Sequence, residues 1–211
     1  MTHALSPGAL FDELLDDRPA RGTATLRHDD GRRTPLPLSR WLGPPCPVDA
    51  AIADAAAGPV LDVGCGPGRL LDALARRGTF AVGVDLSPVA VRLARSRGRR
   101  AMLGSVFDQL PGGWGTALLL DGNVGIGGDA AALLRRVGGL LAAGGAAIVE
   151  VDRPGAGTRA GRVRLEAGER ASRWFAWAHV DATGIASVAR EAGLEVQRIA
   201  RLEDRWFTWL V

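Results

Sequence analysis

The stretch VLDVGCGPGRL, residues 60–70, decides the fold of this chain. Its three glycines, Gly64, Gly66 and Gly68, separate a short apolar run from a segment with helical periodicity. Glycine lets the backbone turn sharply and lets a ligand approach where a Cβ would block it. The helix that follows begins with unpaired N–H groups, which can bind a ligand. The stretch therefore predicts a strand, a ligand-binding turn and a helix; a purely structural turn is the alternative.

From Pro59 onward, short apolar runs alternate with helical periodicities, which is typical of a parallel sheet covered by helices. A closing pair of strands is expected around a hairpin turn at Glu203-Asp204. Gly144-Gly145 is expected to end the helix that precedes the fifth strand. The strands are predicted at residues 59–63, 80–84, 101–103, 116–120, 146–151, 194–200 and 206–211, and the helices at 69–77, 88–96, 130–141 and 181–192.

Two segments lie outside this alternation. Residues 1–47 are predicted to be an N-terminal appendage, with a short helix near residues 9–16 and a hairpin that turns at residues 29–31. Residues 153–180 are predicted to be an insertion after the fifth strand of the domain that spans residues 48–211. Insertions at strand ends of such sheets commonly form lids or substrate walls. We therefore expect both segments to cover a binding site.

Composition excludes several classes of protein. With 47% hydrophobic and 23% charged residues over 211 positions, the chain can form one ordinary domain core rather than a disordered or fibrous structure. No apolar run is long enough for a membrane helix, and the N-terminus lacks a secretory pattern, so we predict a cytoplasmic protein without a membrane partner. The net charge of +3 is only weak evidence for binding of nucleic acid, so we do not expect a nucleic-acid partner. Cys46 and Cys65 are expected to be free thiols, and no metal site is predicted.

Asp85 indicates what kind of ligand the turn binds. It follows the second predicted strand, where a carboxylate can accept hydrogen bonds from the ribose hydroxyls of a nucleoside; an ordinary strand-end aspartate is the alternative. The glycines follow G-x-G-x-G, whereas dinucleotide-binding sites follow G-x-G-x-x-G, and Arg69 stands where that pattern has its last glycine. The spacing therefore disfavours a nicotinamide cofactor.

Four segments in succession, DVGCGPGRL, GVDLSPVAV, SVFDQLP and LLAAGGAAIVE, resemble the motifs of class I methyltransferases that use S-adenosylmethionine (SAM). The resemblance implies an α/β three-layer sandwich with a seven-stranded, mostly parallel sheet whose last strand is antiparallel. It also implies a SAM site in which Asp85 holds the ribose, Leu86 lies against the adenine, and Ser105 and Val106 contact the base. The remaining cofactor residues that it implies are Asp62, Gly64, Cys65, Gly66 and Gly68.

Candidate residues for the reaction follow the fourth predicted strand and end the insertion. Asp121 and Asn123, in the segment DGNVGIGG, are expected to bind the SAM amino group or orient a substrate; a flexible glycine loop is the alternative. His179 is a candidate general base, although a lone histidine is more often a packed residue. An apolar acceptor could lie against Trp41, Trp174, Phe175 and Trp177, which could equally form a core beneath the insertion.

The resemblance implies a SAM-dependent methyltransferase, and we predict in-line transfer to a small-molecule acceptor, in which positioning and exclusion of water supply most of the catalysis. Two alternatives remain open at this point. One is a protein of the same fold that binds the nucleoside or a partner without methyl transfer, and the other is a nicotinamide-dependent oxidoreductase. The sequence leaves open the acceptor, the atom that is methylated and the oligomeric state.

Overall fold

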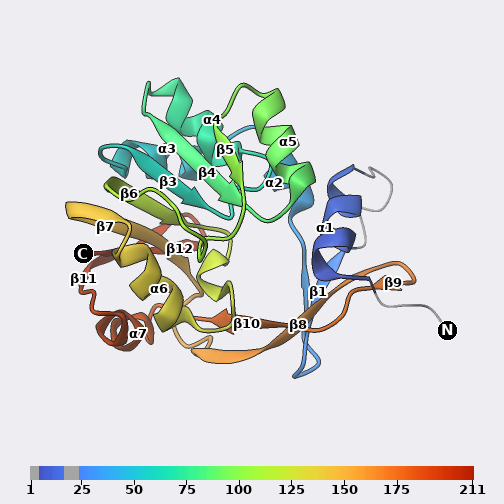
Figure 1. Ribbon diagram of the computed structural model, residues 1–211. Helices are drawn as coiled ribbons and strands as arrows, with labels where there is room; N and C mark the ends of the chain where they lie inside the picture. Colours follow the sequence, from blue (N-terminus) through green and yellow to red (C-terminus); the bar gives the residue numbers. More distant parts are fainter. Residues whose placement is uncertain (1–4, 17–23) are drawn as a thin grey trace.

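The computed structural model describes residues 5–16 and 24–211, and a seven-stranded sheet lies at its centre (Figure 1). The strand order is β11-β12-β7-β6-β3-β4-β5, with only β12 antiparallel to its neighbours. This confirms the predicted α/β fold and its antiparallel last strand. The strands are β3 (Val60–Val63), β4 (Ala81–Asp85), β5 (Ala101–Leu103), β6 (Trp114–Leu119), β7 (Leu141–Val151), β11 (Val196–Leu202) and β12 (Arg205–Leu210).

Helices cover both faces of this sheet, as the three-layer prediction required. Successive residues of a strand point to opposite faces, so Leu118 and Leu119 of β6 enter two different hydrophobic clusters. Trp206 and Trp209 of β12 likewise pack on opposite faces. One face carries α3 (Pro47–Ala55), α4 (Arg69–Arg76) and α5 (Pro88–Ser96), and the other carries α6 (Ala130–Gly138) and α7 (Ile185–Ala192) (Figure 1). Among the described residues, no helix is long and apolar enough to cross a bilayer.

The predicted appendage and insertion form a single second sheet. Its order is β10-β8-β1-β2, with β9 paired to β8, and every pairing is antiparallel. The helices α1 (Pro7–Asp16) and α2 (Leu38–Leu42) pack beside it, while residues 1–4 and 17–23 of the predicted appendage lie outside the described part. The strands are β1 (Thr25–His28), β2 (Arg33–Pro35), β8 (Arg159–Ala167), β9 (Arg170–Ala171) and β10 (Phe175–His179). The sequence indicated the helix and the hairpin, but not their pairing with the insertion.

Two predicted helices were too long. The helix expected over residues 130–141 ends at Gly138, and Leu141 already begins β7, so Gly144-Gly145 lie inside a strand and do not end the helix. Leu140 and Leu141 fit helical spacing, but Leu140 lies in the turn after α6 and Leu141 pairs with Trp114 of β6. The helix expected from Asp181 begins at Ile185, because the Asp181 carboxylate closes a turn by accepting the Gly184 N–H at 2.8 Å. The Glu203-Asp204 hairpin is confirmed.

The second sheet rests on the glycine-rich segment after β6, which includes the short 3₁₀ helix η2 (Asn123–Gly125). A Cβ placed on Gly125 would lie 2.3 Å from the Ala178 carbonyl oxygen and 2.5 Å from Trp177 Nε1. Ile126 forms a β-bridge with Trp177. Close approach of β10 therefore explains at least one of these glycines, where the sequence suggested only a flexible or ligand-binding loop.

We expect Gly125→Ala to destabilise the protein by about 1–3 kcal/mol, because the new methyl group must push β10 away from η2. Urea unfolding measures the change in free energy. Gly112→Ala is the matched control, since a Cβ there makes only an ordinary contact at 3.8 Å with the Leu140 carbonyl oxygen. Equal stabilities for the two variants would contradict the close packing of β10 on η2.

Candidate functional site

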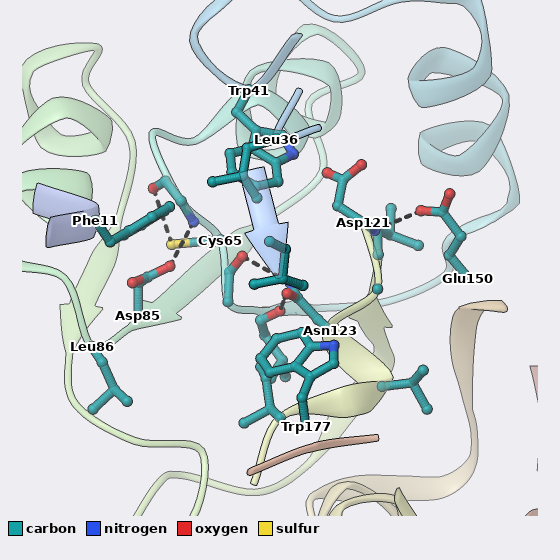
Figure 2. Close-up of a pocket in the computed structure, with 18 of the residues that line it drawn as sticks. Phe11, Leu36, Trp41, Cys65, Asp85, Leu86, Asp121, Asn123, Glu150 and Trp177 are labelled. Carbon is teal, nitrogen blue, oxygen red and sulfur yellow. Dashed lines mark hydrogen bonds between the residues drawn. The ribbon is translucent and has the colours of Figure 1, made fainter. Parts of the chain in front are cut away.

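A cavity of about 760 Å³ opens at the carboxyl ends of β3, β4, β6 and β7. Its volume lies in the range of roughly 300–1,000 Å³ that is typical of small-molecule sites. Figure 2 shows Asp85 and Leu86 on one side of it and Asp121 and Glu150 on the other. Further lining comes from α1, from α2 with the residues just before it, and from the second sheet. It includes Phe11, Leu36, Trp41, Phe175 and Trp177. The cavity is thus enclosed between the main sheet and both predicted cover segments.

The glycine turn forms one wall of this cavity. Gly66 has a φ of +53°, which favours glycine, and a Cβ placed there would meet nothing within 4 Å. The Gly66 N–H donates to Asp85 Oδ2 at 2.8 Å, and the Ser87 N–H donates to Asp85 Oδ1 at 2.8 Å. Burial raises the pKa of the Asp85 carboxyl, although these two hydrogen bonds oppose the shift. Asp85 therefore joins the turn to the start of α5 and still lines the cavity.

Asp62 lies beneath the turn and has an unpaired oxygen. Its side chain is buried, and Oδ2 has no hydrogen-bond partner among the described residues. Burial raises the pKa of Asp62 to about 7, and the carboxylates of Asp121 and Asp85 add to the shift, while Arg69 opposes it. This buried carboxyl therefore changes protonation near neutral pH and is available to a hydrogen-bonding or cationic ligand.

Asn123 and Cys65 hold the turn in place from two sides. Asn123 Nδ2 donates to the carbonyl oxygens of Val63 and Gly64, at 2.8 and 3.0 Å. Cys65 is a free, buried thiol whose pKa is raised by burial, and a Cβ on Gly83 would lie 2.4 Å from its sulfur. Both cysteines are free, as predicted. Packing and hydrogen bonding thus account for much of what Asn123 and Cys65 do here.

Asp121 belongs to a buried ion cluster, which we define as Arg40, Asp49, Arg69, Asp121, Glu150 and Arg205. Asp121 Oδ2 lies 2.5 Å from Arg69 Nη2, and Oδ1 lies 2.6 Å from Arg40 Nη2 and 3.2 Å from Arg205 Nη2. Arg69 also pairs with the fully buried Asp49. Arg205 makes two hydrogen bonds to Glu150, at 2.8 and 2.6 Å. Because three guanidinium groups contact its two carboxylate oxygens, Asp121 is held in one position and stabilises the cavity wall around it.

The remaining predicted cofactor residues lie together at the other end of the cavity. Leu86 exposes 69% of its surface there, although leucine is usually buried, and Ser105 and Val106 also line this end. Ser105 forms a local turn, in which its N–H donates to Asp108 Oδ2 at 2.7 Å and its Oγ accepts the Phe107 N–H at 3.1 Å. The structure therefore brings Leu86, Ser105 and Val106 close to Asp85.

Of the predicted acceptor wall, Trp41, Phe175 and Trp177 line the cavity, and the predicted base His179 lines it as well. Trp174 is not in the lining and instead lies under the Arg164 guanidinium, 5.1 Å from ring centroid to carbon. His179 Nδ1 lies 3.2 Å from Asp152 Oδ2, and its ring is 5.0 Å from that of His28. Neither His28 nor the three arginines on Asp121 could be predicted from the sequence, because long-range pairing brings them to the site.

Comparison with known protein sequences finds methyltransferases that match short segments of this chain. A methyltransferase-domain family matches residues 60–110, about a quarter of the chain. A ubiquinone biosynthesis O-methyltransferase of Xylella fastidiosa is 51% identical over 39 residues, which are 18% of this chain. That match spans only 16% of the relative's length.

Solved structures resemble much more of the chain. A SAM-dependent methyltransferase from Bacteroides fragilis, in complex with S-adenosylhomocysteine, has a TM-score of 0.79 at 19% identity, over 100% of this chain and 96% of its own. This chain has the class I methyltransferase fold. A Burkholderia thailandensis 1,6-didemethyltoxoflavin-N1-methyltransferase, with that compound and S-adenosylhomocysteine bound, shares the methyltransferase fold at a TM-score of 0.56. It is 19% identical and covers 78% of this chain and 76% of its own.

Loss of one member of the ion cluster should destabilise the protein. Arg205→Met is expected to lower the free energy of unfolding by about 3–5 kcal/mol, because it leaves the largely buried Glu150 carboxylate without its guanidinium partner. Chemical denaturation measures the change. Arg201→Met on neighbouring β11 is the matched control, since its exposed guanidinium only donates to the Glu203 carbonyl oxygen, and it should change stability by less than about 0.5 kcal/mol. A loss below 1 kcal/mol for Arg205→Met would contradict the role given to the cluster.

Asp62 should make stability fall as pH rises. Its pKa is about 7 when folded and near 3.8 when unfolded, so the wild type loses stability between about pH 4 and pH 7. Asp62→Asn does not titrate, and its melting temperature relative to wild type should therefore be higher at pH 8 than at pH 5, by a few degrees. Thermal unfolding at both pH values tests this, with exposed Asp54→Asn as the control. A difference that does not change with pH would refute the assigned protonation.

Proposed function

We propose that this protein is an enzyme that binds SAM in the cavity and transfers its methyl group to a small-molecule acceptor. The observation that carries the proposal is the joint placement of the glycine turn, Asp62 and Asp85 on one cavity wall within a class I methyltransferase fold. The family match over residues 60–110 includes all three features. Because curated relatives match only short segments, the activity is inferred from the site and the fold.

The residues present fit SAM. The open space at Gly66 leaves room for a ligand against the backbone, and the unpaired Asp62 oxygen can accept hydrogen bonds from a cationic amino group. Asp85 would hold the ribose and Leu86 would cover the adenine, with Ser105 and Val106 at the base. The remaining cofactor contacts would come from Gly64 and Cys65, which line the cavity. Gly68, which was also predicted to bind the cofactor, is outside the lining and packs against Ala94 of α5. When bound, SAM supplies an activated methyl group on a positively charged sulfur.

The acceptor would occupy the part of the cavity between the main sheet and the cover, which consists of the described residues of segment 1–47 together with segment 153–180. Trp41, Phe175 and Trp177 supply apolar walls that exclude water and fit a small molecule. Asp121 and Asn123 would position the cavity edge instead of exchanging protons, because their polar atoms bond other parts of the protein. The cytoplasmic location and the lack of a nucleic-acid partner stay predictions.

Calorimetry tests the cofactor. Wild-type protein should bind SAM and S-adenosylhomocysteine but not NAD, because the G-x-G-x-G turn does not favour a pyrophosphate. Asp85→Ala should weaken binding of S-adenosylhomocysteine by roughly 10- to 100-fold, since it removes charged hydrogen-bond acceptors from the ribose. Asp54→Ala, which removes an exposed carboxylate on α3, is the control and should bind like wild type.

Two outcomes would count against this function. Tight binding of NAD would favour an oxidoreductase, and unchanged affinity in Asp85→Ala would remove Asp85 from the site. If SAM binds but no methyl group from labelled SAM reaches any compound in a broad panel of small molecules, the protein is a binder and not an enzyme.

A further inference from the structure

Four polar side chains gather at the cover side of the cavity, apart from the residues assigned to SAM. They are His179 at the end of β10, Asp152 after β7, His28 at the end of β1 and Thr34 in β2. All four line the cavity. They come from four separate strands or strand ends of both sheets, so the complete fold is needed to bring them together.

The hydrogen bonds of this group determine which ring nitrogen of His179 is free to accept a proton. His179 Nδ1 lies 3.2 Å from Asp152 Oδ2, and in the neutral ring the N–H belongs on Nδ1, where it donates to the carboxylate. Nε2 then carries a lone pair. It is buried and has no hydrogen-bond partner among the described residues. An unsatisfied buried polar atom costs about 1–3 kcal/mol, which calls for an explanation such as a catalytic role.

The neighbouring charged groups leave Asp152 as the partner for a protonated His179. Arg159 faces His179 across the β8–β10 pair, but its guanidinium donates to the carbonyl oxygens of Ala156 and Gly157. The Asp181 carboxylate is occupied by backbone N–H groups and by Thr158.

The second histidine of the group is expected to stay neutral. Burial lowers the pKa of His28, and the charge of Arg32 adds to the shift. His28 Nε2 is paired with Thr34 Oγ1 at 2.9 Å. His28 therefore adds an uncharged, polar surface beside His179, and the proton-accepting position of the group is His179 Nε2.

We propose that His179 is the general base of the enzyme, that Asp152 is the positioning residue that orients it, and that the acceptor is a weakly acidic hydroxyl on a flat, apolar ring, such as a phenol or an enol. This inference rests on the proposed methyltransferase function. Contact with the acceptor requires a side-chain shift in the wall, because Nε2 is closed to water, and such rotamer changes are common when a ligand binds.

The chemistry of the wall favours a hydroxyl acceptor. A phenol has a pKa near 10 and is mostly protonated at neutral pH, so a base increases its reactivity, whereas a neutral amine already has a free electron pair. The aromatic walls at Trp41 and Trp177 fit a flat ring. In the step, the acceptor oxygen bonds to the methyl carbon as the carbon–sulfur bond breaks, the electron pair stays on sulfur, and the hydroxyl proton moves to His179 Nε2. Asp152 stabilises the imidazolium until the proton leaves to water.

A spectroscopic titration tests the base without turnover. The probe is 4-nitrophenol, whose ionised form absorbs visible light, added to protein saturated with S-adenosylhomocysteine and titrated from pH 5 to pH 9. The apparent pKa of the bound probe should be lower in wild type than in His179→Gln by about one unit or more. Asp152→Asn should give an intermediate value. Trp174→Phe, on the same insertion but outside the cavity, should match wild type.

Turnover provides the second readout. His179→Gln should lower kcat for phenol acceptors by about 10²- to 10⁴-fold and abolish the acidic limb of the pH–rate profile, with the affinity for S-adenosylhomocysteine unchanged. Equal probe titrations in wild type and His179→Gln, failure of the probe to bind, or methylation of amines alone would overturn this inference. Failure of wild type to bind S-adenosylhomocysteine would instead refute the proposed function itself, so the two failures are distinguishable.

Discussion

The pairing of Arg69 and Arg205 with buried carboxylates is the interaction on which the rest of the site depends. Arg69 begins α4 directly after the glycine turn, and Arg205 begins the antiparallel strand β12. Their partners, Asp49, Asp121 and Glu150, come from α3, from the end of β6 and from β7. One set of ion pairs therefore fixes the glycine turn relative to three strands and a helix. Such a cluster adds little net stability over an apolar core, but losing one member leaves a buried charge unpaired, so the arrangement is specific.

The same cluster explains why Asp62 differs from its neighbours. Asp49 and Asp121 are paired with guanidinium groups, whereas Asp62 Oδ2 has no partner among the described residues and is surrounded by other carboxylates. Arg69 favours ionisation of Asp62, but burial outweighs it and raises the pKa of Asp62 to about 7. A cationic ligand beside this oxygen would supply the missing counter-charge. The buried, unpaired Asp62 carboxyl is thus unfavourable in the free protein and becomes favourable when a cationic ligand binds beside it.

Local sequence signals were sufficient to predict the wall of the cavity formed by the glycine turn and insufficient to predict the wall formed by the second sheet. The glycine turn, Asp85 and the N-cap Ser87 lie within short segments whose spacing fixes their geometry, so the sequence placed them correctly. His28 and Asp152 are 124 residues apart. His28 meets His179 because β8 pairs with both β1 and β10, and Asp152 meets it because the Asp152 N–H donates to the Val180 carbonyl oxygen at 2.8 Å. No periodicity within one segment encodes such a pairing. The glycines after β6 were interpreted as a flexible or ligand-binding loop for a related reason. Gly125 has no side chain because β10, which comes from a distant part of the chain, packs directly against it.

The cover is attached to the core through charge as well as through apolar packing. Within the part of the chain that the structure describes, the cluster has three carboxylates, Asp49, Asp121 and Glu150, but the main domain supplies only Arg69 and Arg205 to balance them. The third guanidinium is that of Arg40, from α2 of the cover, which lies 2.6 Å from Asp121. Docking of α2 therefore completes the charge balance beside the cavity. Because Trp41 follows Arg40 directly, the contact that neutralises the cluster also places an aromatic side chain in the wall of the cavity, so docking of α2 forms both features together.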